Sequence, residues 1–544
     1  MNISLNKDEL KLTFRYDHRL VALVKALPAR RYAPQEKAWY IPLVGSMEHV
    51  EKLAQWGFEI DLDTYTAVKG TEDERREIEE LRTQDDAVFA STLPLFPYQN
   101  VGARFLTRAK SALLADEVGL GKTIQTLAVI QEADPESVLI LCPAILKYQW
   151  EAEIRKFLPG WDVQVIDGTA MERRQKWIAS ADIYIANYEL LMRDFEHVAG
   201  TEWDIVVADE ATRIANPLTK TYKALQKVSA RRRIALTGTP VSNRPDEIWG
   251  IVNWLAPGVL GNYLQFIERY CVRNFFGGIA SYKNLEELNA RIKRFMIRRK
   301  KEDVLKELPA KIISDVPFAL SDNERALYVK LRKELLHEIE AEDISKLENP
   351  ITIQNTLTKM LRLRQVANSL ELVSEKTESS KLELLRGLLQ EFVENGRKTI
   401  IFTFFAGMAD ILERELVAYA PLKITGDTLN ENRQDIIDMF NKDEKYKVLV
   451  MTSAGQFGLN IQAASVIVHY DQEWSLAKME QREGRAHRIG QDKTVLVYNL
   501  LAKGTIDEYV AKIVRGKQKL SDSVLGDGVT VADITGILTY GEER

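Results

Sequence analysis

The chain has 544 residues, 45% of them hydrophobic and 28% charged, with a formal net charge of −5. This length is too great for one core and corresponds to roughly three to four domains, while the composition excludes a largely disordered protein. The charge excludes a globally basic protein, but it does not exclude a nucleic-acid partner, because such binding depends on local basic patches.

Cysteine usage and hydropathy restrict the cellular compartments in which we expect the protein. Cys142 and Cys271 lie far apart, and neither they nor the six scattered histidines have metal-ligand spacing. We therefore expect neither a disulfide framework nor a structural metal. The N-terminus MNISLNKDELKL lacks an apolar signal core, and no run approaches the ~18 apolar residues of a membrane span. We expect a soluble, intracellular, cytoplasmic protein with no membrane contact.

Residues 1–66 are expected to form a small α+β domain. LVALVKAL (20–27) has helical spacing, and KAWYIPL (37–43) is typical of a short strand. KGTEDERREIEELRTQDD (69–86) is almost wholly charged, which indicates a linker or a solvated helix, and we place a charged linker at 67–90.

From residue 91 onward, short apolar runs alternate with helical segments. Such runs are typical of parallel strands that are covered on both faces, so the pattern predicts an α/β fold with two parallel-sheet lobes. We place the first lobe at 91–310, with a helical insertion at about 250–310, and a helical inter-lobe region at 311–380. The second lobe covers 381–510, and a final helix and tail cover 511–544. The expected strands are 111–115, 137–143, 182–187, 204–209, 233–238, 398–405, 447–452 and 465–471.

The first strand of the first lobe leads into a glycine-rich turn in LLADEVGLGKTIQTLAVI (113–130). Gly119 and Gly121 let backbone N–H groups close around phosphate oxygens at a helix N-terminus. Lys122 can reach the β- and γ-phosphates, and the Thr123 hydroxyl can bind Mg²⁺. Asp116 stands where the general P-loop pattern has its first glycine. The alternative is an ordinary strand–turn–helix.

Two carboxylates follow a second apolar run in VVADEATRI (206–214). Asp209 stands where a carboxylate holds Mg²⁺, and Glu210 could polarise the attacking water. Alone, such a pair would be a helix cap with a first-turn charge. The P-loop upstream in the same lobe favours a catalytic role for this pair over a helix cap.

Two arginines near the end of the second lobe are candidates for the same reaction. QREGRAHRIGQ (481–491) separates Arg485 and Arg488 by three residues, so one helix face would carry both guanidiniums. Guanidiniums directed at a γ-phosphate stabilise phosphoryl transfer. The alternative is a salt-bridged surface helix; with the P-loop in the other lobe, an arginine finger is favoured.

Together these segments, in this order, resemble helicase superfamily two, and more closely its Swi/Snf-type branch of double-stranded-DNA translocases. The resemblance covers about 93–523 and implies two RecA-like lobes that bind ATP and Mg²⁺. FMIRRKKEDVLKELPAK (295–311) is similar to a signature of the branch that RNA helicases of the superfamily lack, and DEVGLGKT (116–123) is the branch's own P-loop. Further matches are LRLRQVANS (361–369), SSKLELLRGLL (379–389), TSAGQFGLNIQAA (452–464) and the bracing segment IDEYVAKIVRGKQKL (506–520).

The resemblance also implies roles for single residues. Gln99, in LFPYQNVGARFL (95–106), would read the adenine edge, and Thr237 and Thr239 of LTGTP (236–240) would couple hydrolysis to movement. The segments LCPAILKYQW (141–150) and ANYELL (186–191) would touch the nucleic-acid backbone. The nucleic-acid contacts implied in the two lobes are Pro143, Trp150, Asn187, Tyr188, Thr452 and Trp474.

The sequence departs from the branch pattern at several positions. Thr212 replaces the usual histidine of DEAH, at a place that relays the state of the γ-phosphate toward LTGTP, so we assign it a coupling role. Trp474 lacks the Asn-Pro that usually follows. None of the departures removes a residue that holds phosphate or metal. The others are Ser242, Asn243, Ser453 and Gln456.

The N-terminal domain resembles the HARP module of annealing helicases over FRYDHRLVALVKALPARRYAPQEKAWYIP (14–42). Its basic residues alternate with aromatic ones, which suits nucleic acid because cations meet phosphates and rings stack on bases. The alternative is a structural domain whose aromatic residues form its core. The candidate contacts are Arg30, Arg31, Lys37 and Trp39, with Tyr32 beside them.

The sequence therefore predicts a monomeric DNA-dependent ATPase that translocates on double-stranded DNA and remodels or anneals branched structures. Two alternatives stay open: an RNA-stimulated helicase, and a DNA scaffold that holds ATP without turnover. A chromatin remodeller is disfavoured, because no histone-tail reader is evident beyond the motor. The compact layout favours a bacterial or phage source, which would place the protein at the nucleoid or in the host cytoplasm.

Overall fold

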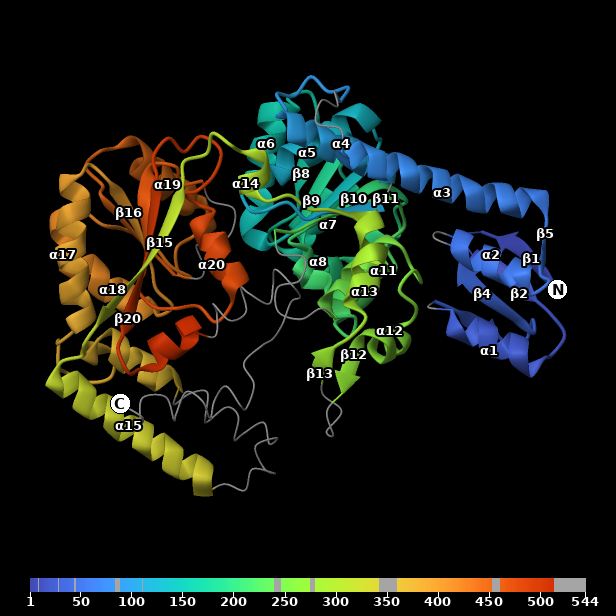
Figure 1. Ribbon diagram of the computed structural model, residues 1–544. Coiled ribbons are helices and arrows are strands. Elements are labelled where there is room, and N and C mark those ends of the chain that lie inside the picture. The colour runs from blue at the N-terminus through green and yellow to red at the C-terminus, as the bar shows by residue number, and fades with distance from the viewer. Residues whose placement is uncertain are drawn as a thin grey trace. The chain divides into compact units, whose positions relative to one another are not determined.

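The computed structural model places two compact units (Figure 1). One contains residues 1–117 and 121–304, the other 118–120 and 305–544. The structure describes residues 1–512 except 8, 28, 44–45, 84–88, 110, 239–245, 274–278, 342–359 and 453–459.

The N-terminal domain is a five-stranded, mostly antiparallel sheet with the order β3-β4-β2-β1-β5. Alternating residues of β1, β2 and β4 meet α1 and α2 in one apolar core, which includes Leu10, Leu12 and Val24. Asp17 caps α1, because its Oδ1 accepts from the backbone N–H of Arg19 at 2.7 Å. The elements are β1 (Asn2–Asn6), β2 (Glu9–Thr13), α1 (His18–Ala26), β3 (Arg31–Ala33), β4 (Ala38–Pro42), α2 (Met47–Gln55) and β5 (Glu59–Ile60).

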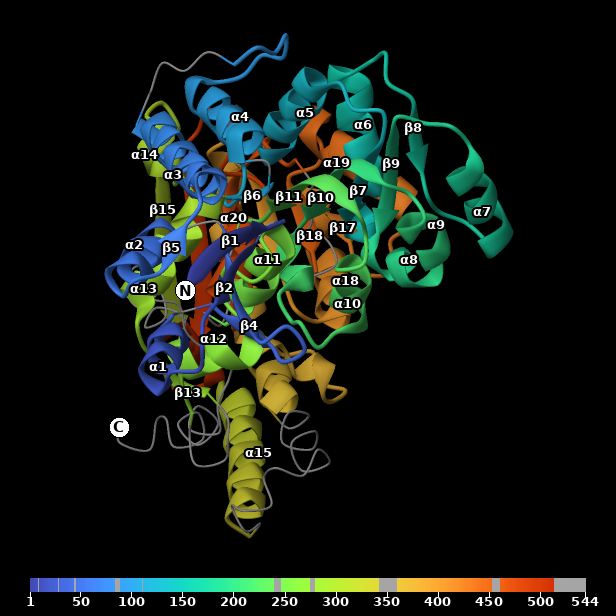
Figure 2. The ribbon, with the colours of Figure 1, turned by 90° about the vertical axis from the view of Figure 1, so that its right-hand side faces the viewer.

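The charged segment after this domain is a helix, α3 (Leu62–Thr83). Its 22 residues cross the boundary expected at residue 66. Val68 belongs to the N-terminal core, and further along α3 packs against α4 (Pro97–Ala109) (Figure 2). Of the two expectations for this segment, linker or solvated helix, the helix is confirmed up to Thr83.

The first lobe contains a seven-stranded parallel sheet with the order β14-β6-β11-β10-β7-β9-β8. β7, for example, is buried along its whole length, as the apolar runs predict for strands that helices cover on both faces. The strands are β6 (Ser111–Leu114), β7 (Val138–Cys142), β8 (Val163–Val165), β9 (Ile183–Asn187), β10 (Trp203–Asp209), β11 (Ala230–Leu236) and β14 (Met296–Ile297), and the helices include α5 (Lys122–Ala133), α6 (Lys147–Phe157), α7 (Ala170–Ile178), α8 (Tyr188–Arg193), α9 (Phe195–Ala199), α10 (Lys220–Leu225) and the 3₁₀ turns η1 (Ala144–Leu146) and η2 (Ala211–Ile214).

The insertion expected at about 250–310 is mainly helical, and it also contains a two-stranded sheet. Its last strand, β14, returns to the main sheet and pairs with β6. The elements are α11 (Glu247–Leu255), α12 (Tyr263–Tyr270), β12 (Cys271–Arg273), β13 (Ile279–Tyr282), α13 (Leu285–Ile292), η3 (Lys293–Phe295) and α14 (Lys301–Val304).

The second lobe contains a six-stranded parallel sheet with the order β15-β20-β19-β16-β18-β17, which confirms the predicted α/β class with two parallel sheets. The inter-lobe region 311–380 is not wholly helical as expected, because residues 311–318 form an edge strand paired with β20. The elements are β15 (Lys311–Phe318), α15 (Asp322–Ala341), η5 (Leu370–Leu372), α17 (Ser380–Glu394), β16 (Lys398–Phe402), α18 (Ala406–Glu415), η6 (Val417–Tyr419), β17 (Leu422–Ile424), α19 (Asn430–Lys442), β18 (Val448–Met451), β19 (Ala464–His469), α20 (Leu476–Glu483) and β20 (Val495–Ala502).

Among the described residues, no helix has both the length and the apolar character that a membrane crossing requires. Cys142 and Cys271 are both buried and unbridged.

Candidate active site

The predicted catalytic segments of the first lobe meet at one edge of its sheet. β11 pairs in parallel with both β6 and β10, so the three strands end side by side. The P-loop follows β6, Asp209 ends β10, and Thr237 follows β11. The carboxyl edge of a parallel sheet is the usual place for ligand binding in α/β folds.

The P-loop turns into α5 through a left-handed glycine. Gly121 has φ +73° and stands immediately before Lys122, the first residue of the helix. The Lys122 Nζ donates to the backbone carbonyl of Asp116 at 2.8 Å, so the side chain folds back over the loop. Thr123 is the second helical residue, in the first turn, where backbone N–H groups are available to phosphate oxygens.

Gln99 packs directly against this loop. Its side chain is buried, and its Oε1 accepts from the backbone N–H of Phe96 at 3.0 Å. A Cβ atom at position 121 would lie only 2.5 Å from the Gln99 Nε2, so position 121 admits only glycine without movement. The residue expected to read adenine and the loop expected to hold phosphate are therefore in contact.

Asp116, which replaces the first P-loop glycine, is the buried partner of Arg299. Its carboxylate is fully buried and accepts from the Arg299 Nε at 2.9 Å, while Gln125 donates to it at 3.2 Å. Arg299 also donates to the Tyr98 carbonyl. The backbones of the same two segments are also hydrogen-bonded: the Glu117 N–H donates to the Arg299 carbonyl at 3.0 Å. The branch signature at 295–311 therefore fixes the P-loop in place.

The carboxylate of Asp209, at the end of β10, accepts two hydrogen bonds from the first lobe. The Asp209 Oδ2 accepts from the indole N–H of Trp150 at 2.9 Å, and its Oδ1 accepts from the Glu210 N–H at 2.9 Å. Glu210 has a left-handed backbone with φ +51°, an uncommon conformation for a residue with a side chain. Strain of this kind is often found at functional sites.

Four residues expected at the nucleic-acid backbone lie inside the first lobe. Trp150 and Tyr188 are each only 2% exposed, and the Tyr188 hydroxyl donates to the Asp209 carbonyl at 2.7 Å. Burial, reinforced by Asp209, raises the pKa of Tyr188 well above its ordinary value. Pro143 and Asn187 are also buried. Trp150 and Tyr188 offer almost no surface to DNA; their contacts instead position Asp209, a role that the sequence did not indicate.

The coupling candidates lie close to the same edge. The Thr212 Oγ1 is 3.5 Å from the Glu210 carbonyl oxygen, within η2. Thr237 is fully buried, and its N–H donates to the Leu114 carbonyl at 3.2 Å. Thr239, Ser242 and Asn243 lie outside the described residues, as do Ser453 and Gln456.

The helix expected to carry Arg485 and Arg488 ends earlier, so the prediction of one shared helix face is wrong. α20 stops at Glu483, where Gly484 begins a series of tight turns. The Arg485 N–H donates to the Arg482 carbonyl at 3.1 Å, a three-residue closure that ends a helix. Arg485 is buried and Arg488 half-buried, both in the turns after α20.

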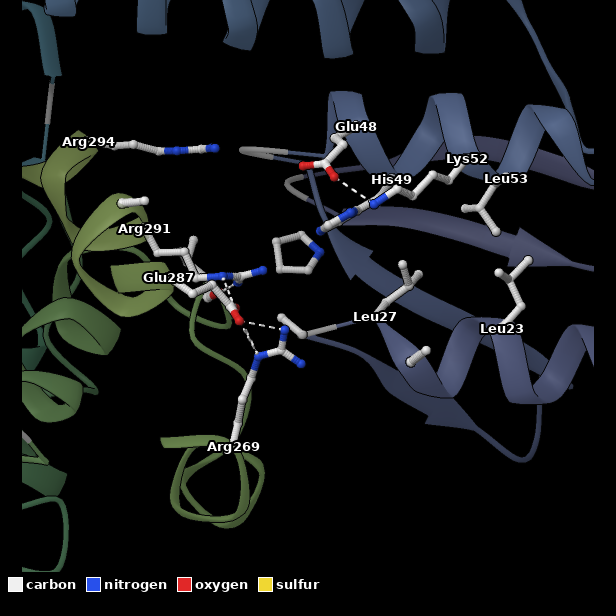
Figure 3. A pocket seen from close by; sticks show the side chains of 15 residues that line it. Leu23, Leu27, Glu48, His49, Lys52, Leu53, Arg269, Glu287, Arg291 and Arg294 are labelled. Atoms are coloured by element: carbon white, nitrogen blue, oxygen red, sulfur yellow. Dashed lines mark hydrogen bonds and ion pairs between the residues drawn. The ribbon is translucent and has the colours of Figure 1, made fainter. Parts of the chain in front are cut away.

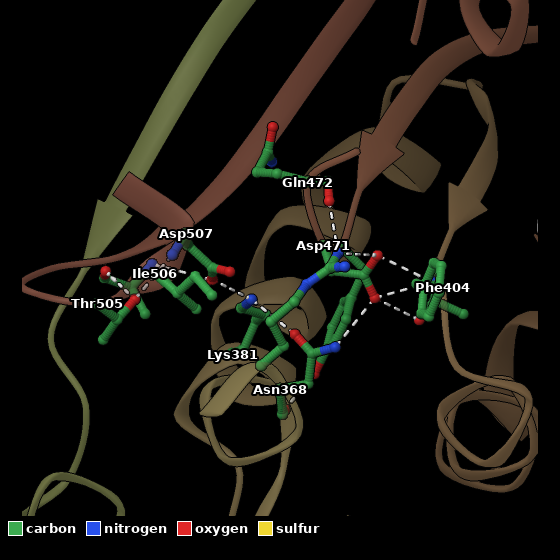
Figure 4. Close-up of polar contacts among 12 residues, drawn as sticks. Asn368, Lys381, Phe404, Asp471, Gln472, Thr505, Ile506 and Asp507 are labelled. Atoms are coloured by element: carbon green, nitrogen blue, oxygen red, sulfur yellow. Dashed lines mark hydrogen bonds and ion pairs between the residues drawn. The ribbon is translucent and has the colours of Figure 1, made fainter. Parts of the chain in front are cut away.

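The carboxyl edge of the second sheet carries a buried polar network (Figure 4). Asp471, after β19, accepts from the Asn368 Nδ2 at 3.0 Å, the Thr403 Oγ1 at 2.8 Å and the Phe404 N–H at 2.9 Å. The Lys381 Nζ joins Asn368 at 2.8 Å to Asp507 at 2.6 Å. Sequence reasoning assigned no role to this network.

Two candidate DNA contacts of the second lobe lie near that edge. Thr452 directly follows β18 and is 5% exposed, and its N–H donates to the Ile424 carbonyl at 3.1 Å. Trp474 is half-buried and packs against the core cluster that contains Met479 and Val510.

The N-terminal candidates do not share one surface. Trp39 belongs to the core face of its sheet, whereas Arg31 lies on the other face, over the Tyr40 ring at 4.3 Å. Arg31 also pairs with Glu9 at 2.6 Å. Arg30 donates to the Leu27 carbonyl at 2.7 Å, and Lys37 is exposed in the turn between β3 and β4.

The residues of the first-lobe edge fit ATP with Mg²⁺. The glycine turn leaves a space that a Cβ would fill, a lysine and a helix N-terminus are beside it, and hydroxyl and carboxylate oxygens suit a hard cation. Two parallel sheets, one with a P-loop and a strand-end Asp-Glu pair, define a nucleotide-binding protein of the P-loop class.

Comparison with known families agrees with this class. Residues 62–372 match the model described as SNF2-related domain, and residues 380–490 match the helicase conserved C-terminal domain. The chain belongs to the SNF2-related family.

Three similar proteins illustrate the relationship. An uncharacterized ATP-dependent helicase of Mycoplasma genitalium is 32% identical over 79% of this chain and 42% of its own length. An uncharacterized ATP-dependent helicase of Mycoplasma pneumoniae is 31% identical over 90% of this chain and 47% of its own. The human SWI/SNF-related matrix-associated actin-dependent regulator of chromatin subfamily A member 1 is 29% identical over 80% and 44%. The chain therefore spans less than half the length of these relatives.

Proposed function

We propose that the protein is an ATP-driven translocase on double-stranded DNA. The observation that carries the proposal is the convergence of Lys122, Asp209 and Glu210 at one sheet edge, with the P-loop held by the Asp116–Arg299 pair. The family membership and the names of the helicase relatives support the same activity.

In this proposal each residue of the edge has one task. Lys122 and the start of α5 bind the phosphates, and Thr123 and Asp209 hold the cation, which neutralises charge on the transferred phosphoryl group when bound. Glu210 takes a proton from the attacking water. Arg485 and Arg488 supply positive charge to the γ-phosphate. Gln99 recognises the base.

The support differs from residue to residue. Glu210 follows the buried strand β10 and is half-buried, so its carboxylate has access to water. Trp150 and Tyr188 fix Asp209 from behind, which suits a residue that must present its carboxylate in one geometry. The roles of Arg485 and Arg488 rest on the sequence QREGRAHRIGQ (481–491) alone.

We further propose that the substrate is branched or forked DNA, which the motor anneals or remodels. The motivation is the HARP-like sequence of residues 14–42 and the exposed Lys37 and Tyr32 on its domain. Because contacts with phosphates carry little sequence information, the motor should show little sequence preference.

The central test is the steady-state ATPase rate of the full chain on duplex, forked and single-stranded DNA and on RNA. We expect the strongest stimulation by duplex and forked DNA. Stronger stimulation by RNA would identify an RNA-stimulated helicase instead, and no hydrolysis with any nucleic acid would identify an ATP-binding scaffold. The preference for forked DNA should disappear when residues 1–61, which precede α3, are removed. If the preference persists, the N-terminal domain has a structural role instead.

Two substitutions test the catalytic assignment. Lys122→Ala should abolish hydrolysis while DNA binding stays within a few-fold. Arg488→Ala should reduce the DNA-stimulated kcat by about 10³-fold if it acts as an arginine finger. An unchanged kcat would remove Arg488 from that role, with Lys503→Ala as an exposed control in the same lobe.

A further inference from the structure

A pocket of about 410 Å³ lies between the N-terminal domain and the insertion of the first lobe (Figure 3). α1 and α2 form one wall, and α12 and α13 form the other. No residue of the P-loop or of the Asp209–Glu210 segment lines it. It is therefore separate from the proposed ATP site.

The two walls have different chemistry. The wall from the N-terminal domain is largely apolar, with Leu23, Leu27 and Leu53. The wall from the insertion carries Arg269, Arg291 and Arg294. Figure 3 shows these arginines extending from the insertion toward the N-terminal domain, with the leucines on the other side.

The pocket contains more positive than negative charge. Glu287 accepts from both Arg269, at 2.7 Å, and Arg291, at 3.0 Å, so one carboxylate serves two guanidiniums. Glu48 pairs with Lys52 at 2.6 Å. These two carboxylates face four cationic side chains, because Arg294 also lines the pocket.

Two polar groups of the pocket have no hydrogen-bond partner in the described part of the chain, although Glu72 and Glu48 lie close enough to Arg294 to act on its pKa. Arg294 makes no hydrogen bond or ion pair there, although it is half-buried, and burial lowers its pKa. The Nδ1 of His49 is buried without a hydrogen-bond partner. Burial, followed by the nearby Arg291, lowers the pKa of His49 to about 4, so the imidazole is neutral at pH 7. A buried polar group without a partner is costly, which points to a ligand.

The size of the pocket restricts that ligand. A volume of 410 Å³ lies within the range of about 300–1,000 Å³ for small-molecule sites and exceeds what a single phosphate ion needs. Guanidiniums favour phosphate oxygens, and the leucine wall favours an apolar or aromatic body. We propose that this pocket binds a phosphate ester with an aromatic body, such as a nucleoside phosphate, with the phosphate at Arg291, Arg294 and His49.

The ligand would contact two parts of the chain at once. Its phosphate meets Arg291 of α13, Arg294 of η3 and His49 of α2, and its body meets the leucine wall, so binding holds the N-terminal domain against the first lobe. The same chemistry is offered by a free nucleotide and by the phosphorylated 5′ end of a DNA strand. This inference does not depend on ATP turnover.

The first experiment measures binding of dTMP to the full chain by calorimetry. We expect Arg294→Gln to weaken binding at least tenfold, which corresponds to about 1.4 kcal/mol. The matched control is Arg76→Gln, an exposed arginine of α3 that does not line the pocket, and it should bind as the parent does. Lys122→Ala separates the pocket from the ATP site: binding kept in Lys122→Ala but weakened in Arg294→Gln supports the proposal, and the reverse pattern overturns it.

The second experiment distinguishes the two sources of the ligand. It compares single strands with a 5′-phosphate and with a 5′-hydroxyl, and a phosphate-dependent gain that Arg294→Gln removes identifies the DNA end. A gain from dTMP alone identifies a free nucleotide. Binding of neither, or equal binding by Arg294→Gln, overturns the proposal.

A third measurement needs no substitution at the arginines. NMR titration of the His49 imidazole should show its pKa rise when dTMP is present, because a bound phosphate favours the protonated ring. An unchanged His49 titration at saturating dTMP contradicts the proposed phosphate position.

Discussion

In each parallel sheet an aspartate lies at or just beyond the end of a central strand, and the two aspartates are surrounded differently. Asp209, after β10, is half-buried and accepts from one indole and one backbone N–H. Asp471, after β19, is fully buried and accepts from an amide, a hydroxyl and a backbone N–H, with Arg364 at 3.6 Å.

The difference shows how one topology serves two purposes. A carboxylate at the carboxyl edge of a parallel sheet is well placed for a ligand, but it can equally tie loops together. The two aspartates differ in burial, because Asp209 is half-buried and Asp471 is fully buried. The greater exposure of Asp209 fits the chemistry that we propose for the first-lobe edge, whereas the hydrogen bonds of Asp471 hold the loops of the second-lobe edge in place.

Among the tests of this comparison, the largest effect is expected for Glu210→Gln, which removes the proposed general base beside Asp209. Loss of the general base should lower the DNA-stimulated kcat by 10²-fold or more, with the melting temperature nearly unchanged. ATPase assays and thermal unfolding measure the two quantities. Glu202→Gln, an exposed carboxylate before β10, is the control. Retention of most of the activity would show that Glu210 is not the base.

Asp471→Ala tests whether the second-lobe edge stabilises the fold. Removal of a buried, multiply bonded carboxylate takes the acceptor from the Asn368 amide and the ion-pair partner from Arg364, so we expect a loss of about 3–5 kcal/mol in stability. Denaturant unfolding should show it. Asp209→Ala is the matched variant: it should lower hydrolysis while costing much less stability. Equal destabilisation by both substitutions would refute the distinction.

Trp150→Phe tests the hydrogen bond from the indole N–H of Trp150 to the Asp209 carboxylate. The ring still fills the core, but the N–H to the carboxylate is lost, so Mg²⁺ half-saturation should rise about tenfold. ATPase titrations with Mg²⁺ measure this shift. If the main change were instead in DNA affinity, the original prediction of a nucleic-acid contact for Trp150 would be restored.

Glu483 makes the stability of the second lobe depend on pH. Burial alone would raise its pKa, but His469 and Lys311 hold it at about 2, below the ordinary 4.5. The folded-state pKa is depressed, so this contribution to stability is present above pH 4.5 and is lost as the pH falls toward 2. Lys311→Met should raise the pKa and shift acid unfolding to higher pH, each pKa unit being worth about 1.4 kcal/mol. Lys442→Met, at an exposed pair, should leave the midpoint unchanged.

The smallest effect is expected for Thr212→His. An imidazole reaches further than the threonine hydroxyl, so DNA stimulation should change by a few-fold at similar basal turnover. The ratio of stimulated to basal ATPase rates is the measurement. No change in that ratio would count against a coupling role.

Much of the fold could be predicted because buried parallel strands are continuous apolar runs. Two strands of the second lobe do not follow that pattern. β15 contains Asp315 and Pro317, and Tyr498 and Asn499 interrupt β20. Both strands lie at the end of the sheet where β15 is the edge, and their half-exposed positions weaken the hydrophobic signal.

The site could be predicted as segments more reliably than as side chains. Sequence identified the P-loop and the Asp-Glu pair, but it could not show that Trp150 and Tyr188 turn inward to Asp209. Likewise, RRKK offers four basic residues, and only the fold shows that Arg299 and Lys301 are inside while Arg298 and Lys300 are exposed. Whether a side chain of a short segment points into the core or toward solvent depends on tertiary contacts, which no local sequence pattern encodes.

The Asp116–Arg299 pair has a consequence for how a nucleotide could be sensed. Arg299 lies five residues before Val304, where the first compact unit ends and the chain continues into the second. Any shift of the P-loop on filling would pull on this guanidinium and on the backbone bonds beside it, and so on the start of the connecting segment. The loop that we propose to hold phosphate and the segment that leaves the lobe would then move together.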